Sequence, residues 1–272
     1  MFVMEVRNDA NLKEKYGAKA EAWLKDIEVS IRAWDKRGCW HDFDEKTGWY
    51  SVGMEYPDKD GNLQKNISIF PGGTYAYNKV NDFLLSLVLA YRLTGDEWYR
   101  VRLEKCATFW RDHWRDDGNH VEWNYRDHAL PGDYESGVVG QGKPKTGAWV
   151  HPNSLYYEVD VRTAAALYDA GIFFQKPDLE KLIKTHLELM WRKDTPPTFT
   201  NINGKDGRNK NGFLWTSLAH FDPRVRELWK EAMNNPQRTW TWQKSVVEYL
   251  IEMTYPVSWE PRDTGEIFKK QK

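Results

Sequence analysis

Residues 77–114 read YNKVNDFLLSLVLAYRLTGDEWYRVRLEKCATFWRDHW, and they set the expectation for the whole chain. Apolar side chains recur at helical spacing on both sides of the segment 94–97, as in amphipathic helices. Gly95 favours the end of the first helix, while Thr94 and Glu97 have the spacing of a capping box at the start of the second. The stretch therefore predicts two helices, 77–94 and about 97–114, that form an antiparallel pair.

The same arrangement recurs after a long interruption. A helical pattern over about 154–170 ends at Gly171, and a second helix near Pro177 extends to about 191. A first helix is predicted over about 11–37, before Gly38. Further helices are predicted from Asp222-Pro223 through 233 and over about 237–253. Repeated helix pairs joined by long loops indicate a repeating helical architecture.

One part of the chain changes period. The segments 49–56 and 63–70 are strand-like, and the turn-rich segment 57–62 lies between them, so a small β-hairpin is predicted over about 49–70. We therefore expect a mainly α protein, an α/α toroid built of antiparallel helix pairs, incomplete or open as a barrel, in a single domain over 1–272. A helical solenoid is the alternative, although its connecting loops are usually shorter.

Composition narrows the class of function. The chain has 272 residues, 40% hydrophobic and 29% charged, with a formal net charge of −1. Nucleic acids and anionic membranes require clustered excess Lys and Arg, so neither is an expected partner. No apolar run approaches the roughly 20 residues of a membrane span. The first residues lack a signal-peptide pattern, so the protein is expected to be intracellular, or secreted or periplasmic with its signal outside this sequence.

The chain is rich in aromatic residues, with 15 Trp, 14 Tyr and 11 Phe. Such rings suit a core, and they also suit a carbohydrate cleft. Six of them, with two histidines and several carboxylates, fall within residues 123–160, most of which belong to a Gly-rich loop predicted over about 116–153. Long irregular loops in compact domains are usually functional, so this loop is the expected site.

Several short motifs resemble those of α/α-toroid polysaccharide lyases, a group similar to alginate and glucuronan lyases. They are Tyr77-Asn78 at a helix start, Leu93-Thr94-Gly95-Asp96 at its end, Trp123-Asn124-Tyr125, Asp160-Val161 leading to Ala170-Gly171-Ile172, and Asp222-Pro223. The resemblance covers roughly residues 11–233. The chain departs from that group where Tyr156-Tyr157 stand in place of a histidine ahead of Asp160. It also has fewer helices before residue 11.

The resemblance implies β-elimination on a uronic-acid-containing polysaccharide. Such a reaction needs a donor or cation that neutralises the uronate carboxylate, a base for the proton at C5 and an acid for the leaving oxygen. Asn78 matches the asparagine that this group carries at a helix start, and it is the expected neutraliser. His151 is the first candidate base, Tyr157 and Tyr156 are candidates for base or acid, and Arg208 is the candidate cation. The expected substrate-binding residues are Trp123, Asn124, Arg126, Trp149, Glu158 and Asp160.

Two other functions fit the same sequence. A glycoside hydrolase needs paired carboxylates, which could come from Asp127, Asp133, Glu135, Glu158 and Asp160. A catalytically inactive carbohydrate-binding toroid would keep the cleft without the base. No cofactor and no metal site are expected, because the histidines lack metal-ligand spacing and the two cysteines are far apart. The sequence does not predict an oligomeric state.

Overall fold

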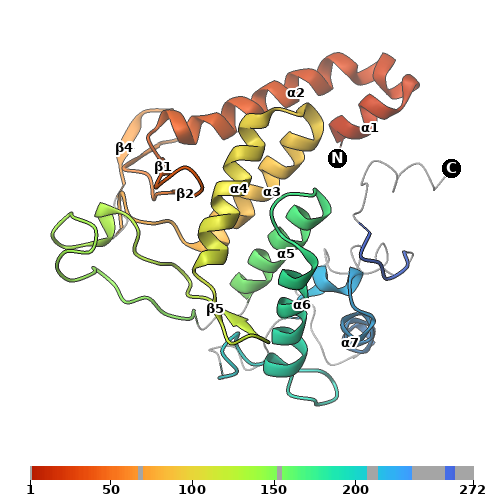
Figure 1. The fold of residues 1–272 in the computed structure, drawn as a ribbon. Helices are drawn as coiled ribbons and strands as arrows, with labels where there is room; N and C mark the ends of the chain where they lie inside the picture. Colours follow the sequence, from red (N-terminus) through yellow and green to blue (C-terminus); the bar gives the residue numbers. More distant parts are fainter. Residues whose placement is uncertain (1, 67–69, 152–154, 207–213, 235–254, 261–272) are drawn as a thin grey trace.

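The computed structural model describes residues 2–66, 70–151, 155–206, 214–234 and 255–260. Within these ranges the chain is mainly helical, as the sequence predicts (Figure 1). The α-helices are α1 Phe2–Asn8, α2 Ala10–Lys36, α3 Tyr77–Thr94, α4 Glu97–Asp112, α5 Leu155–Asp169, α6 Lys176–Lys184 and α7 Pro223–Met233. The predicted helix over about 237–253 lies outside the described residues.

Helix ends follow the local chemistry of the sequence. The carboxylate of Asp9 accepts hydrogen bonds from the first main-chain N–H groups of α2, and Asp96 and Asp222 do the same for α4 and α7. Gly95 ends α3 in the left-handed conformation, at φ 68°. Glycine takes this conformation without the steric cost that a Cβ brings. The cap of α4 is thus Asp96 and not the expected capping box of Thr94 and Glu97. Because caps act within a few residues, the predicted helix starts still lie close to the observed ones.

Helices α3 and α5, the first members of the two helix pairs, pack against each other and run parallel. Their contacts advance together along both helices: Lys79 with Tyr156, Asn81 with Asp160 and Asp82 with Arg162. Helices α4 and α6 run back from them, as Figure 1 shows. Parallel first helices in successive pairs are expected of an α/α toroid. The closed or open ring itself stays a prediction.

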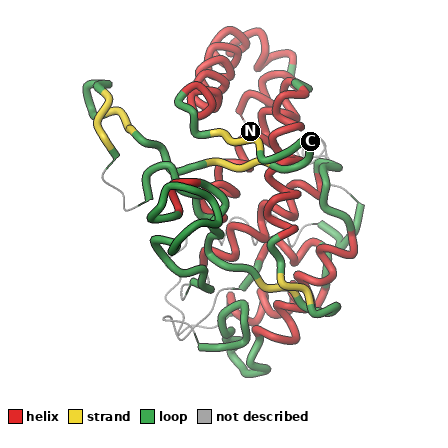
Figure 2. The backbone as a smooth tube through the Cα atoms, turned by 60° about the vertical axis from the view of Figure 1, so that its left-hand side comes forward, coloured by secondary structure: helices red, strands yellow, loops and turns green. Residues whose placement is uncertain are grey.

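The strands correct the expectation of one hairpin over 49–70. The described residues form three separate antiparallel pairs: β1 Trp40–Asp42 with β2 Gly48–Tyr50, β3 Glu55–Pro57 with β4 Leu63–Lys65, and β5 Arg115–Asp116 with β6 Val121–Glu122. Residues 49 and 50 therefore pair with residues 41 and 40, which precede them in the chain, and not with the segment 63–70. Of the predicted hairpin, the described residues form the part over 55–65, which projects from the helical body in Figure 2, and residues 67–69 lie outside the described residues.

Three short irregular helices complete the fold. They are the 3-10 turns η1 Pro131–Asp133 and η3 Thr216–His220, and the π-helix η2 Thr185–Met190, which continues directly from α6. The sequence predicts one helix to about residue 191 and gives no sign of this change of winding. Tight 3-10 turns commonly connect elements, and π-helical turns are rare and frequently occur at functional sites.

Aromatic side chains fill much of the core between the helix pairs. Trp49, Trp110, Trp123, Trp215 and Trp229 are all at most 2% exposed. Most of the aromatic richness of the chain is therefore structural. No described helix is both long and apolar enough to cross a membrane.

Candidate functional site

The long loop between α4 and α5 is fixed at its middle by one buried carboxylate. Asp133 is 0% exposed and accepts hydrogen bonds from Arg126 Nη2 at 2.6 Å and from the main-chain N–H of Leu130 at 3.0 Å. It also accepts bonds from the N–H and hydroxyl of Thr74, at 3.0 Å and 2.5 Å. The Arg126 guanidinium lies 3.9 Å from the centroid of the Phe70 ring. We call this group the Asp133 anchor, and it ties the loop to the segment that precedes α3.

Beyond the anchor, four rings gather where the loop returns to α5. The centroid of the His151 ring lies 4.7 Å from that of Tyr125 and 4.5 Å from that of Tyr156. Tyr125 stacks on Tyr156 at 5.5 Å and lies 6.0 Å from Trp149. We call Tyr125, Trp149, His151 and Tyr156 the His151 cluster. All four are partly exposed, so a ligand can reach them.

The main chain at His151 is held from two sides. Its N–H donates to the hydroxyl of Tyr157 at 2.6 Å, and its carbonyl accepts from Asn201 Nδ2, also at 2.6 Å. Tyr157 is 1% exposed, and burial raises the pKa of its hydroxyl far above the usual range. A phenol with so high a pKa is a poor proton donor to a substrate. The geometry therefore gives Tyr157 a positioning contact to His151, while Tyr156 is the partly exposed member of the tandem pair.

The first turn of α3 lies beside the His151 cluster. The N–H of Tyr77 donates to the carbonyl of Tyr125 at 3.1 Å, which joins the helix start to the loop. The Lys79 ammonium lies 5.8 Å from the centroid of the Tyr156 ring. Between them, Asn78 is 4% exposed, and its Oδ1 has no hydrogen-bond partner within the described residues. A buried polar atom left unpaired is costly, so it calls for a partner such as water or a ligand.

Below this turn lies a buried carboxylate that the sequence assigned to substrate binding. Asp160 accepts hydrogen bonds from Asn81 Nδ2 at 2.7 Å and from Trp123 Nε1 at 2.9 Å. Burial raises its pKa to about 7, while the two donors act in the opposite direction. At 2% exposure the carboxylate braces α3 and α5 from within the core and does not reach a ligand.

The structure also corrects the roles expected of Trp123 and Arg126. Trp123 is 0% exposed and packs against Trp110, so neither face of its indole is open for stacking on a sugar. Arg126 is 3% exposed and paired with Asp133 in the Asp133 anchor. Their polar and aromatic character is used inside the protein. The sequence could not distinguish this, because Trp and Arg at a loop suit both uses.

Asn124 belongs to a chain of hydrogen bonds that leads from the surface to the start of α3. Arg115 Nη1 donates to Asn124 Oδ1 at 2.9 Å, and Asn124 Nδ2 donates to Asp127 Oδ1 at 2.9 Å. The other oxygen of Asp127 accepts from the hydroxyl of Tyr77 at 2.7 Å. Each polar group in this chain already has a protein partner, which fixes the segment that carries Tyr125.

The remaining expected residues contribute less to the site. Glu158 is partly exposed on α5, and its charge raises the pKa of Asp160. Arg208 lies outside the described residues. Among the carboxylates considered for hydrolysis, Asp133 and Asp160 are buried and bonded, and Glu135 lies on an exposed part of the loop. The part of the chain that the structure describes holds no group of three or more His, Cys, Asp or Glu side chains arranged for a metal ion.

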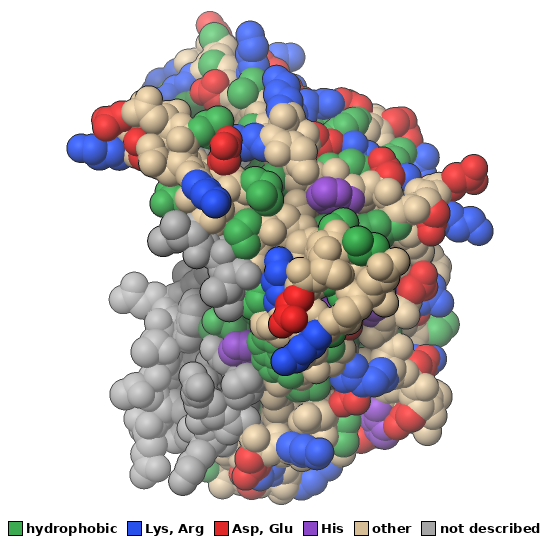
Figure 3. Space-filling view, turned by 90° about the vertical axis from the view of Figure 1, so that its left-hand side faces the viewer, with side chains coloured by type: hydrophobic (Ala, Val, Ile, Leu, Met, Phe, Trp, Pro, Cys, Tyr) green, Lys and Arg blue, Asp and Glu red, His purple; other side chains and the backbone are tan. Residues whose placement is uncertain are grey.

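Two members of the site were not identified from the sequence. Tyr125 stands in the Trp123-Asn124-Tyr125 motif but was not assigned a role, and Lys79 directly follows Asn78. The signal for Lys79 was its place beside Asn78 in the first turn of a helix, and the signal for Tyr125 was its place in the motif that also holds Trp123 and Asn124. Figure 3 shows the side of the molecule that carries the long loop, where hydrophobic side chains lie next to a histidine.

Comparison with known proteins adds no assignment. No family model, no curated protein and no solved structure matches this chain. The chemistry of the site is therefore argued from the described residues themselves: a histidine between two tyrosines, a lysine above one of them, and a buried asparagine with an unpaired oxygen.

Proposed function

We propose that this chain is a polysaccharide lyase that cleaves a uronic-acid-containing polysaccharide by β-elimination. The observation that carries the proposal is the placing of the first turn of α3, which bears Asn78 and Lys79, beside the cluster that holds His151 and Tyr156. It supplies, within one group, an amide, a cation, a base and an acid of the kinds that this reaction needs. The resemblance to α/α-toroid lyases in short motifs supports the same reaction.

The proposed reaction breaks the C5–H bond of the uronate and the C4–O4 bond to the next sugar. His151 takes the C5 proton, a C4–C5 double bond forms, and Tyr156 gives a proton to the departing O4. As the C5 proton leaves, negative charge spreads onto the carboxylate of the uronate. The Nδ2 group of Asn78 and the ammonium of Lys79 would stabilise this negative charge in the transition state. The positive end of the α3 dipole acts in the same sense.

In this proposal Tyr157 keeps a positioning role. Its hydroxyl fixes the main chain of His151 at 2.6 Å, and its ring packs against Trp123 with centroids 5.5 Å apart. Tyr125 and Trp149 then offer ring faces to the sugar, as Trp123 cannot. Arg208 remains a proposed second cation, since it lies outside the described residues.

The test begins with a panel of uronate polymers, including polyglucuronate and alginate, and neutral polysaccharides. A lyase produces unsaturated ends, which are followed by their ultraviolet absorbance. Reducing sugar without that absorbance would instead indicate hydrolysis. Retention on an immobilised polysaccharide with neither product would indicate a binding protein. Either of these results would refute the lyase proposal.

Site variants sharpen the test once a substrate is found. His151→Ala and Tyr156→Phe should each remove most turnover, while Tyr56→Phe, on the projecting β3–β4 hairpin, should not. Asn78→Ala and Asn81→Ala form a matched pair one helical turn apart. Asn78→Ala removes the Nδ2 donor proposed for the uronate carboxylate, so it should lower turnover. Because Oδ1 has no partner within the described residues, stability should change little.

Asn81→Ala removes the bond to the buried Asp160 and should lower stability, because a buried acceptor loses its partner. Wild-type turnover in both His151→Ala and Asn78→Ala would show that the chemistry lies elsewhere.

A further inference from the structure

A hollow lies between the β5–β6 hairpin and the π-helix η2. Its volume is about 240 Å³. It is lined by Arg115, Asp116, Asp117, His120, Val121, Glu122, Leu189 and Asn203. We call it the hairpin pocket. None of its lining residues was among the expected catalytic or substrate-binding residues, although five of them lie in the loop over about 116–153 that was expected to form the site.

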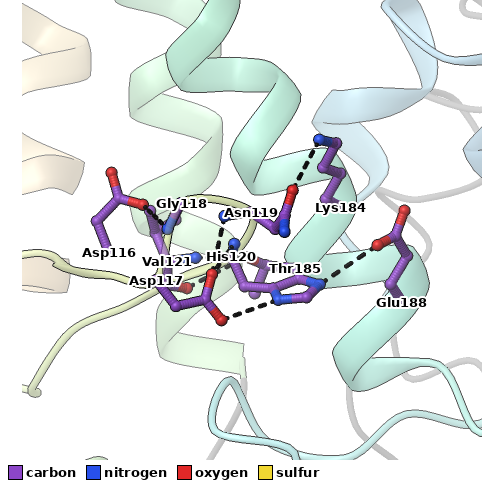
Figure 4. A network of polar contacts seen from close by, with 9 residues as sticks. All are labelled: Asp116, Asp117, Gly118, Asn119, His120, Val121, Lys184, Thr185 and Glu188. Carbon is purple, nitrogen blue, oxygen red and sulfur yellow. Dashed lines mark hydrogen bonds and ion pairs between the residues drawn. The ribbon is translucent and has the colours of Figure 1, made fainter.

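The walls of the hairpin pocket are fixed by polar contacts between the hairpin and the helix behind it (Figure 4). Thr185 donates from its hydroxyl to the carbonyl of Val121 at 3.2 Å and accepts from the N–H of Val121 at 2.8 Å. The His120 ring lies between Asp117 and Glu188, with nitrogen–oxygen distances of 3.1 Å and 3.3 Å. A hollow held on both sides in this way is preformed, as ligand sites usually are.

The charge of the hairpin pocket is negative. Its lining holds three carboxylates and one guanidinium. Glu122 is paired with Arg115 at 2.7 Å and Asp116 with Lys181, so Asp117 is the lining carboxylate that has no Lys or Arg partner within the described residues. A hydrogen bond from Lys181 lowers the pKa of Asp116, and main-chain N–H groups lower that of Asp117 to about 2. Both groups are therefore ionised at neutral pH. A uronate would be repelled here, whereas an ammonium would be attracted.

The lining also suits a small polyhydroxylated ring. Val121 and Leu189 supply apolar surface, and Asn203 and the carboxylates supply acceptors. The carboxylate of Asp117 is well exposed, with a side chain 64% accessible. Metal binding fits poorly, because the described residues show no cluster of three potential ligands.

The hairpin pocket and the His151 cluster are built on the same two segments. Glu122 lines the pocket and Tyr125 stands three residues further along the loop. Asn203 lines the pocket, and Asn201, two residues before it, bonds to the carbonyl of His151. Three residues of extended chain span roughly 10 Å. A sugar chain that lies across the His151 cluster can thus place a neighbouring residue in the pocket.

We propose that the hairpin pocket is a subsite for an amino sugar with a free ammonium group. The proposal rests on the proposed function, because it places the amino sugar next to the uronate that is cleaved. The substrate is then a polysaccharide in which uronate and amino-sugar residues alternate. A polymer of uronate alone would place a uronate carboxylate next to the carboxylates of the hairpin pocket, and the two would repel each other.

The test uses calorimetric titration of the full chain with a glucosamine trimer and with its fully N-acetylated counterpart. The glucosamine trimer should bind more tightly, and its affinity should fall as salt is added. Asp117→Asn should weaken its binding about threefold to fivefold. The matched control is Asp58→Asn, which changes a carboxylate that also accepts main-chain N–H groups in a turn, but on the distant β3–β4 hairpin.

Equal affinity for the two trimers, or no binding of either, would overturn the subsite. Equal affinity for spermidine and for the glucosamine trimer would overturn its assignment to a sugar. The lyase proposal fails separately. One outcome is that binding depends on the amine and is weakened by Asp117→Asn, while no polymer gives unsaturated product. That outcome supports the subsite and refutes the lyase proposal. If polyglucuronate gives unsaturated product and the two trimers bind equally well, the lyase proposal is supported and the amino-sugar subsite is refuted.

Discussion

Replacing Asp133 with Ala tests the energetics of the long loop. The carboxylate is 0% exposed, and its loss leaves the buried guanidinium of Arg126, the N–H of Leu130 and both donors of Thr74 without their acceptor. Breaking a buried ion pair by removing one partner costs about 3–5 kcal/mol. For a chain of this size, that loss corresponds to a fall in melting temperature of roughly 6–20 °C.

The measurement is urea denaturation followed by tryptophan fluorescence, with limited proteolysis of the loop as a local readout. The Asp133→Ala variant should unfold at lower urea and should be cut faster within residues 134–147. The Arg126→Met/Asp133→Leu double variant removes both charges together and should recover much of the lost stability. Glu227→Ala, which breaks the exposed pair with Lys230, should change the free energy of unfolding by at most about 1 kcal/mol.

The reasoning fails if Asp133→Ala lowers the free energy of unfolding by less than about 1 kcal/mol, the range of an exposed ion pair. It also fails if the double variant is no more stable than Asp133→Ala. Either result would mean that water or a rearranged loop satisfies the guanidinium, and that the Asp133 anchor does not hold the loop.

Three further predictions concern the packing and titration of the site. Gly132→Ala should destabilise the fold by about 1–3 kcal/mol, because a Cβ there would lie 2.2 Å from a neighbouring backbone carbon, whereas Gly147→Ala has open space and should be neutral on thermal melting. Asp160 has a folded pKa of about 7, above its unfolded value, so the native state keeps a proton that the unfolded state releases. The free energy of unfolding should therefore fall by up to about 4 kcal/mol as pH rises from about 4 to about 7, and Asp160→Asn should flatten that profile. Tyr157→Phe removes the acceptor for the N–H of His151 and should lower stability by about 1 kcal/mol and reduce turnover; unchanged turnover would exclude the positioning role.

The helices were predictable from the sequence because their signals are local. Apolar spacing, Gly95 and the capping residue Asp96 lie within a few positions of the boundaries that they set. Strand pairing is less local. Trp49 pairs with His41. The turn signal between 49–56 and 63–70 favours pairing of these two segments, and nothing in the local sequence shows that residue 49 pairs with an earlier strand instead. The π-helix after α6 has the sequence of an ordinary helix, so its change of winding was not predictable.

The site was predictable only in part. The expectation that His151 and Tyr156 lie together agrees with the geometry, and Asn78 lies next to the lysine above that tyrosine. Whether a ring or a charge on the loop faces a ligand depends on packing between distant segments. Trp123 and Arg126 therefore looked like binding residues although both are buried. The enzymatic assignment of the cluster stays a prediction until turnover is measured.

The loop beyond the Asp133 anchor has a consequence for protein engineering. The two ends of this part of the loop are bonded to each other directly after the anchor. Tyr134 forms an antiparallel bridge with Pro144, and the N–H of Lys145 donates to the carbonyl of Asp133 at 2.8 Å. The nine residues 135–143 between them are exposed. Lengthening a loop whose ends are already joined adds little closure entropy. A fluorescent reporter or an affinity tag inserted there should therefore lower the stability of the fold only slightly.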